Sequence, residues 1–226
     1  MLVAVFYTAN AQLYSYIDDP SGNYASVALN ATGTNLSRVN GTLEQISCPT
    51  GFVSYEHSKS TTYGNGRPSI QFSVMADAGF QLNVTNISVD IRRNPKGPTT
   101  WRLAYSLDGG TSWTNSGTDF FVESSNCLGG TNLSWDVTDF STVNSMLVRV
   151  IGFSAHSALN GESTLRNIMV DGSVSIADED GDGFTIDVDC NDTDAAINPD
   201  ATEVCNGIDD NCNGDIDDGA GTIWYA

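Results

Sequence analysis

The acidic residues of this 226-residue chain are concentrated in one segment near its carboxyl end. Residues 177–219 hold 15 Asp and Glu and no Lys or Arg, whereas residues 1–176 hold 13 acidic and 9 basic residues. Carboxylates at this density repel one another unless solvent or a counter-ion offsets their charge. We therefore predict two parts: a globular body over residues 12–176 and a chemically distinct acidic segment over residues 177–219.

Within the acidic segment, carboxylates recur at alternate positions before a glycine. Asp178, Asp180 and Asp182 precede Gly183, and Asp189 is the twelfth residue counted from Asp178. Calcium-binding loops use this spacing, with oxygen ligands at positions 1, 3, 5, 7 and 12 and a glycine at position 6. The alternative, a disordered acidic tail, does not explain the register. The residues predicted for this first calcium site are Asp178, Asp180, Asp182, Asp189 and, through its carbonyl, Phe184. Asp187 is a further predicted metal ligand.

A second cluster repeats the pattern with amides at two of its positions, and it predicts a second site formed by Asp209, Asn211, Asn213, Asp215 and Asp217. Its twelfth position is Ala220, so the ion needs ligands from elsewhere, and the candidates are Asp187, Asp192 and Asp194. Between the clusters, residues 192–197 are predicted to form an N-cap and one or two helical turns that end before Pro199.

Residues 178–219 resemble the metal-binding repeat of the MopE family. The resemblance rests on Asp189-Cys190-Asn-Asp192, Ile197-Asn-Pro199, the run from Ala201 to Gly207 and the run from Asp209 to Gly214. It implies metal binding, by calcium-type loops or by copper, for which the founding protein is named. Copper is not expected here, because no His follows His156 and copper selects imidazole or sulfur ligands. Residues 220–226 resemble the start of a further copy, which implies a longer chain.

The body shows two-residue alternation of apolar side chains and no sustained helical period. Gly- and Asn-rich turns such as Asp108-Gly-Gly110 separate the alternating runs. This pattern predicts an all-β fold, an antiparallel β-sandwich of jelly-roll type. In residues 81–91 the alternation slips near Thr85 and Asn86, which predicts a bulge or a new strand. The alternating sets are Ile70, Phe72 and Val74; Trp101, Leu103, Tyr105 and Leu107; Leu133, Trp135 and Val137; and Met146, Val148 and Val150.

Three stretches of the body, Val89–Arg93, Gly97–Trp101 and Tyr105–Gly110, resemble the core of a jelly-roll module. Such modules occur in secreted and surface proteins of Gram-negative bacteria, and residues 165–172 resemble their closing strand. The resemblance covers residues 14–176. It implies a galactose-binding-like or carbohydrate-binding-like fold without specifying a ligand.

The amino end and the cysteines indicate export. Residues 1–11 are interpreted as a truncated signal peptide, because Ala9 and Ala11 have the small-x-small spacing of a cleavage site; the alternative is a first strand. We expect Cys48 to be bridged to Cys127 and one pair to form among Cys190, Cys205 and Cys212, unless the thiols are free. The predicted location is secreted or on the cell surface.

The sequence predicts no catalytic residues. His57 and His156 have no adjacent catalytic partner, and Glu56, Asp119, Glu123 and Glu162 could pair as glycosidase acids only if the fold brought them together. Trp101 and Trp135 are in phase with core residues, whereas Trp113 is equally compatible with the core or with stacking on a sugar.

We therefore expect a non-catalytic extracellular binding or adhesion module, a jelly roll carried on calcium-rigidified repeats, with a glycan or surface polymer as partner. The alternative is a carbohydrate-binding accessory domain of a secreted hydrolase. The net charge of −19 disfavours nucleic acid, and no apolar run is long enough to span a membrane.

Overall fold

The computed structural model describes residues 11–16, 26–39, 44–46, 52–56, 69–124, 130–155 and 161–219. Within these ranges the chain forms strands and turns but no helix, and so no helix that is long and apolar enough to cross a bilayer. The strands are β1 Ala11–Tyr16, β2 Ser26–Val27, β3 Ala31–Gly33, β4 Ser37–Val39, β5 Glu44–Ile46, β6 Phe52–Glu56, β7 Ser69–Ala76, β8 Phe80–Arg93, β9 Pro98–Ser106, β10 Thr114–Phe121, β11 Thr131–Val143, β12 Ser145–Ala155 and β13 Glu162–Ile176.

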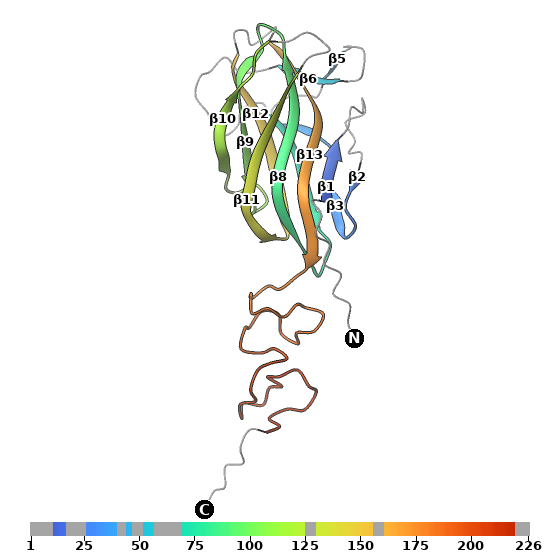
Figure 1. Ribbon diagram of the computed structural model, residues 1–226, viewed down its shortest axis with the longest axis vertical. Helices are drawn as coiled ribbons and strands as arrows, with labels where there is room; N and C mark the ends of the chain where they lie inside the picture. The colour runs from blue at the N-terminus through green and yellow to red at the C-terminus, as the bar shows by residue number, and fades with distance from the viewer. Residues whose placement is uncertain are drawn as a thin grey trace, which may run out of the picture.

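Two antiparallel sheets form a sandwich, which confirms the predicted all-β fold of jelly-roll type (Figure 1). The first sheet has the order β11-β8-β13-β1-β2, with β6 also paired to β13 and β5 paired to β6. The second sheet has the order β10-β9-β12-β7-β3, with β4 also paired to β7. Strands that are distant in sequence pair within each sheet, so the two faces that meet are assembled from the whole body.

The predicted alternation places the core residues between the sheets. Trp101, Phe72 and Tyr14 are among the largest fully buried side chains, and the rings of Tyr14 and Phe72 stack with centroids 4.9 Å apart. Leu107 departs from the pattern, because β9 ends at Ser106 and Leu107 lies exposed in the following turn. The three alternating sets of apolar residues predicted for β7, β11 and β12 are all buried in the core.

The slip in the alternation is a bulge within one continuous strand. β8 runs without a break from Phe80 to Arg93, but its pairing with β13 shifts between Asn86 and Val84, leaving Thr85 as the extra residue. Leu82 and Val84 on one side and Ile87 and Val89 on the other therefore all face the core.

Beyond the sandwich, the chain continues from the end of β13 into the acidic segment, which contains turns and bends but no strand as far as Gly219 (Figure 1). The N–H of Ala177 donates to the carbonyl of Gly79 in the β7–β8 turn at 3.0 Å, and the N–H of Ile186 donates to the carbonyl of Ala177 at 3.0 Å. The first bond attaches the start of the acidic segment to the sandwich, and the second closes the first loop of that segment onto its start.

The helical turns predicted for residues 192–197 do not form, and this prediction was wrong. The segment instead makes separate turns: Asp194 N–H donates to Asn191 O at 3.0 Å and Ile197 N–H donates to Asp194 O at 2.8 Å. The carboxylate of Asp194 also accepts from Ala196 N–H. Asp and Asn side chains thus compete with the carbonyls for the amide donors that a helix needs.

Candidate metal centre

The first acidic loop is shaped by hydrogen bonds from its own backbone to its aspartates. The two carboxylate oxygens of Asp178 accept from the N–H groups of Gly181 and Gly183, at 2.8 and 3.1 Å. Asp180 accepts from Asp182 N–H at 3.1 Å, and Asp182 accepts from Phe184 N–H at 2.8 Å. Gly183 has a φ of 101°, a conformation that residues with a Cβ rarely adopt. The sequence therefore folds this loop around a common centre.

Three of the predicted ligands are brought together in this loop. One carboxylate oxygen each from Asp178, Asp180 and Asp182 lies within 4.8 Å of the other two. Calcium–oxygen bonds are about 2.3–2.6 Å long, so oxygens at opposite sides of one ion can be about 5 Å apart. The spacing of the three aspartates therefore fits a single calcium-sized cation.

Four carboxylate oxygens in this region are buried and accept no hydrogen bond. They are the Oδ2 atoms of Asp180, Asp182, Asp189 and Asp192. In each of these residues the other oxygen, Oδ1, accepts from a backbone N–H group. The Asp189 and Asp192 side chains are the most buried of the four, with residue exposures of 8 and 7 %. Buried carboxylate oxygens without a partner are costly, because they have lost water and gained nothing in its place.

The electrostatics of the first loop also favour a bound cation. The pKa of Asp180 is raised above its ordinary value, first by burial and then by the negative charges of Asp182, Asp189 and Asp178. Repulsion among these carboxylates disfavours the charged form, and a bound cation would reverse this effect.

Three other predicted metal ligands lie in or near the first loop but outside the group formed by Asp178, Asp180 and Asp182. Asp187 is exposed and accepts a hydrogen bond from the hydroxyl of Thr185, two residues away. Phe184, the expected carbonyl ligand, follows Gly183 directly and is half-buried. Asp192, which the sequence pattern offered only as a partner of the second cluster, lies beside the first loop: its Oδ1 accepts from Glu179 N–H at 3.2 Å.

The second loop has the same local shape. Asp209 accepts from the N–H groups of Asn213 and Gly214, as Asp178 does from its own loop. Asn211 and Asn213 each accept from a backbone N–H two residues later, whereas Asp215 is exposed. Asp217 accepts at Oδ1 from the N–H groups of Asn206 and Gly207, both at 3.0 Å. Its carboxylate therefore also holds the preceding turn.

A buried glutamate that the sequence pattern did not single out organises this second loop. Glu203 is 8 % exposed, and its two oxygens accept from Asn211 N–H and Asp217 N–H, both at 2.9 Å. Asp210 is similarly buried and accepts from Val204 N–H and the Asn206 side chain. Neither Glu203 nor Asp210 occupies a ligand position of the calcium-loop spacing, so the sequence pattern alone could not have identified them.

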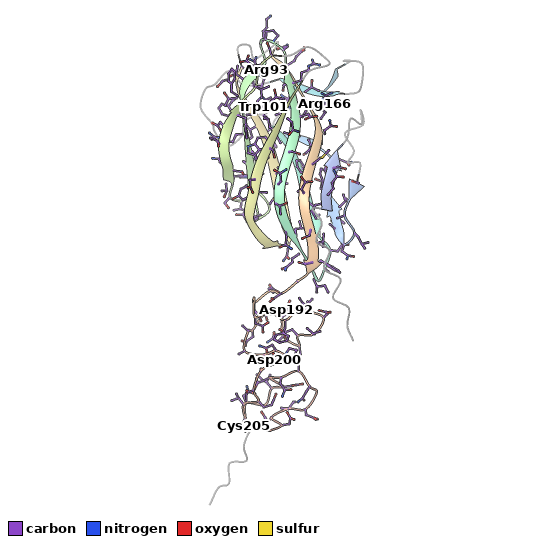
Figure 2. The ribbon with its side chains drawn as sticks, viewed as in Figure 1. Arg93, Trp101, Arg166, Asp192, Asp200 and Cys205 are labelled. Carbon is purple, nitrogen blue, oxygen red and sulfur yellow. A yellow bond between two sulfur atoms is a disulfide. The ribbon has the colours of Figure 1, made fainter. Side chains whose placement is uncertain are left out.

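A disulfide joins the two loops. Cys190, adjacent to Asp189, is bonded to Cys212, which lies between Asn211 and Asn213, and their Cα atoms are 5.6 Å apart. The sequence predicted one pair among the three acidic-segment cysteines without specifying it, and the structure pairs Cys190 with Cys212 and leaves Cys205 exposed with a free thiol. The predicted Cys48–Cys127 bridge lies outside the described residues. Figure 2 shows Asp192 nearer the sandwich than Cys205, with Asp200 between them.

Of the acidic residues considered for glycoside hydrolysis, Glu56 on β6 and Glu162 on β13 are register partners in the first sheet. Asp119 forms an ion pair with Arg102, and the exposed Glu162 accepts from the side chain of Asn94 at 3.4 Å. Glu123 is also exposed. His57, His156 and the side chain of Glu56 lie outside what the structure describes. Trp101 and Trp135 are buried in the core as predicted.

Trp113 instead packs on the outer face of the second sheet. It covers a small buried cluster of Ala104, Ile151 and Phe153, whose side chains face away from the main core. The guanidinium carbon of Arg149 lies 3.7 Å from the centroid of the Trp113 ring, and Arg149 Nε donates to the Gln71 side chain at 2.8 Å. This face therefore combines an aromatic ring with fixed polar groups.

Comparison with known families defines the acidic segment as carrying a metal-binding motif. The family model for the copper-binding MopE motif, described as a metal-binding motif, matches residues 189–218. The match begins at Asp189, so Asp178, Asp180 and Asp182 precede it. No curated protein gives a significant match to the chain.

Several solved structures align with part of the chain at low similarity. A carbohydrate-binding module of family 28 specific for non-crystalline cellulose is 12 % identical, covers 66 % of this chain and 96 % of that one, and gives a TM-score of 0.39. The K1 cleaved adhesin domain of Lys-gingipain from Porphyromonas gingivalis W83 is 10 % identical, with coverages of 72 and 99 % and a TM-score of 0.37. A family 29 carbohydrate-binding module from Piromyces equi is 15 % identical, with coverages of 64 and 93 % and a TM-score of 0.30.

Proposed function

We propose that this chain is a non-catalytic extracellular binding module in which a β-sandwich, residues 12–176, is carried on a calcium-stiffened segment, residues 177–219. The single observation that carries the calcium assignment is the set of four buried carboxylate oxygens, on Asp180, Asp182, Asp189 and Asp192, that accept no hydrogen bond. Residues 177–219 contain no Lys or Arg that could offset these charges, so a bound cation is the partner that we assign to them.

The donor set favours calcium over copper. The oxygens that converge in the first loop are carboxylates, which hard cations such as calcium prefer. Copper selects imidazole or sulfur, but residues 177–219 contain no His, and two of their three cysteines are joined in the disulfide. The first loop would hold one calcium ion with Asp178, Asp180, Asp182, the Phe184 carbonyl and Asp189, and Asp209, Asn211, Asn213, Asp215 and Asp217 would contribute to a second.

Calcium would stiffen the joint with the sandwich. The first loop begins two residues after β13 ends, and its Ala177 N–H is bonded to Gly79 in the β7–β8 turn. An ion held by residues 178–189 would fix the direction in which the rest of the segment leaves the sandwich. Extracellular modules of this type bind calcium with dissociation constants of ~10⁻⁴ to 10⁻³ M, which suits a structural ion where calcium is abundant.

The extracellular setting is supported by the disulfide between Cys190 and Cys212, because such bonds persist outside the reducing cytosol. The interpretation of residues 1–11 as the end of a signal peptide agrees with this setting. In a longer secreted or surface protein, residues 220–226 would lead into another repeat.

The test is calcium titration of the full chain by calorimetry, with limited proteolysis in calcium and in chelator. We expect Asp182→Asn to abolish binding at the first loop and to make the acidic segment as protease-sensitive in calcium as the wild type is in chelator. Asp200→Asn removes the same charge from an exposed residue between the loops and serves as the matched control. Copper binding that calcium cannot displace, or equal protease resistance in both solutions, would contradict the assignment.

The second candidate function is carbohydrate binding on the outer face of the second sheet. The observation that favours it is the arrangement of Trp113, Arg149 and Gln71, since the indole offers an apolar contact while fixed guanidinium and amide groups can pair with sugar hydroxyls. Arg102 is similarly held by Asp119, with one guanidinium nitrogen 2.6 Å from a carboxylate oxygen.

A glycan array probed with the full chain tests this candidate. Arg149→Ala should remove any binding that this face provides, whereas Arg166→Ala, on β13 of the other sheet, is the control of the same chemistry. Binding that both variants retain equally would exclude the Trp113 face as the ligand site.

A further inference from the structure

Asp192 lies outside the twelve-residue loop that the sequence pattern defines, yet its environment is that of a metal ligand. Only 7 % of the residue is exposed. Its Oδ1 accepts from Glu179 N–H, and its Oδ2 is buried with no hydrogen-bond partner. Glu179 stands between Asp178 and Asp180, so the Asp192 carboxylate is bonded to the backbone of the segment that carries two of the loop's aspartates.

The turn that carries Asp192 also carries Asp189. Asn191 N–H donates to Asp189 Oδ1 at 2.7 Å, which leaves Asp189 Oδ2 buried and without a partner, as in Asp192. Both residues therefore use one oxygen to fix the turn and keep the other unpaired. A protein that only needed Asp192 as a backbone acceptor could use Asn at this position, because an amide oxygen accepts the same bond from Glu179 without a buried charge.

We propose that Asp192 is a ligand of the cation in the first loop, supplied from outside that loop, and this inference rests on the proposed calcium site. The site then draws carboxylates from residues 178–182 and from the turn at residues 189–192. The ion cross-links the start of the acidic segment, which is bonded to the sandwich, to the turn beside Cys190, whose disulfide leads to the second loop. One ion thereby connects the sandwich to both loops.

The additional carboxylate also raises the charge selectivity of the site. Asp178, Asp180, Asp182, Asp189 and Asp192 present five negative charges, which favours divalent and trivalent hard cations over monovalent ones. Terbium(III), which replaces calcium in oxygen-only sites, is therefore a suitable probe of the ligand count.

The experiment measures calcium affinity by calorimetry and, in parallel, the number of water molecules on bound terbium from its luminescence decay in H₂O and D₂O. We expect Asp192→Asn to weaken calcium binding about 10-fold or more and to add about one water to the bound terbium, because the metal loses a ligand. Asn keeps the bond from Glu179 N–H, so this variant tests the charge and not the turn.

Asp200→Asn is the matched control, because Asp200 is exposed, lies eight residues away and would lose the same charge. It should leave both affinity and water number unchanged. Asp182→Asn reports on the proposed calcium site itself. If Asp182→Asn abolishes binding while Asp192→Asn leaves the water number unchanged, Asp192 is not a ligand although the calcium site stands. If the wild type binds neither calcium nor terbium, the proposed function fails and this inference fails with it.

Discussion

The disulfide between Cys190 and Cys212 provides a quantitative test of how calcium binding and folding are coupled in the acidic segment. The bridge spans 22 residues of sequence. In the chain-entropy model, removing a cross-link over a loop of this length increases the entropy of the unfolded segment by an amount worth about 3.4 kcal/mol at 25 °C. We propose that this segment, with 15 acidic and no basic residues, folds only with calcium. The lost stabilisation should therefore be measured as a lower apparent affinity for calcium.

A loss of about 3.4 kcal/mol corresponds to a roughly 300-fold larger apparent dissociation constant for calcium. This factor is an upper limit, because the unfolded segment without the disulfide retains some structure. The assay is calorimetric calcium titration of the Cys190→Ser, Cys212→Ser double variant in a Cys205→Ser background. Cys205→Ser alone is the control, since it removes the exposed free thiol and leaves the bridge intact. Calcium affinity in the double variant within about twofold of this control would refute the coupling, because folding would then contribute almost nothing to binding.

Two further predictions concern the sandwich. Gly172→Ala should lower the free energy of unfolding by roughly 1–3 kcal/mol or more, because the new Cβ would lie 2.0 Å from the Asn83 carbonyl oxygen, whereas Gly130→Ala, with nothing nearer than 3.4 Å, should have a much smaller effect in thermal denaturation. The pKa of Asp108 is held well below its usual range, first by hydrogen bonds from the side chain and backbone of Ser112 and then by Ser106. A carboxylate with a lowered folded pKa stabilises the fold above its unfolded pKa and loses that contribution as pH falls, so the stability advantage of the wild type over Asp108→Asn should shrink below about pH 4. An advantage that stays constant from pH 7 to pH 2 in urea unfolding would show that the charge of Asp108 does not stabilise the β9–β10 turn.

The sequence by itself determined the features that depend on short separations. Two-residue alternation placed Phe72, Trp101, Trp135 and Val148 in the core, because side chains on a strand alternate between faces whatever its partner. A slip in the same alternation predicted a bulge or a new strand near Thr85, and the structure shows the bulge. The aspartate spacing defined the first loop, because Asp178 bonds to backbone groups only three and five residues away.

The tertiary structure decided what depends on contacts between distant residues. Periodicity could not pair Cys190 with Cys212 over 22 residues or place the Asp192 carboxylate on Glu179 N–H thirteen residues earlier. Nor could it set Arg149 of β12 between Gln71 of β7 and Trp113, which precedes β10. The helical turns expected near Asp194 failed for a related reason, since propensity did not include the side-chain acceptors that captured the amide donors. Residue spacing predicts the shape of a loop whose hydrogen-bond donors and acceptors are close in sequence. A ligand from a later turn reaches the site only through the tertiary fold, which spacing does not encode.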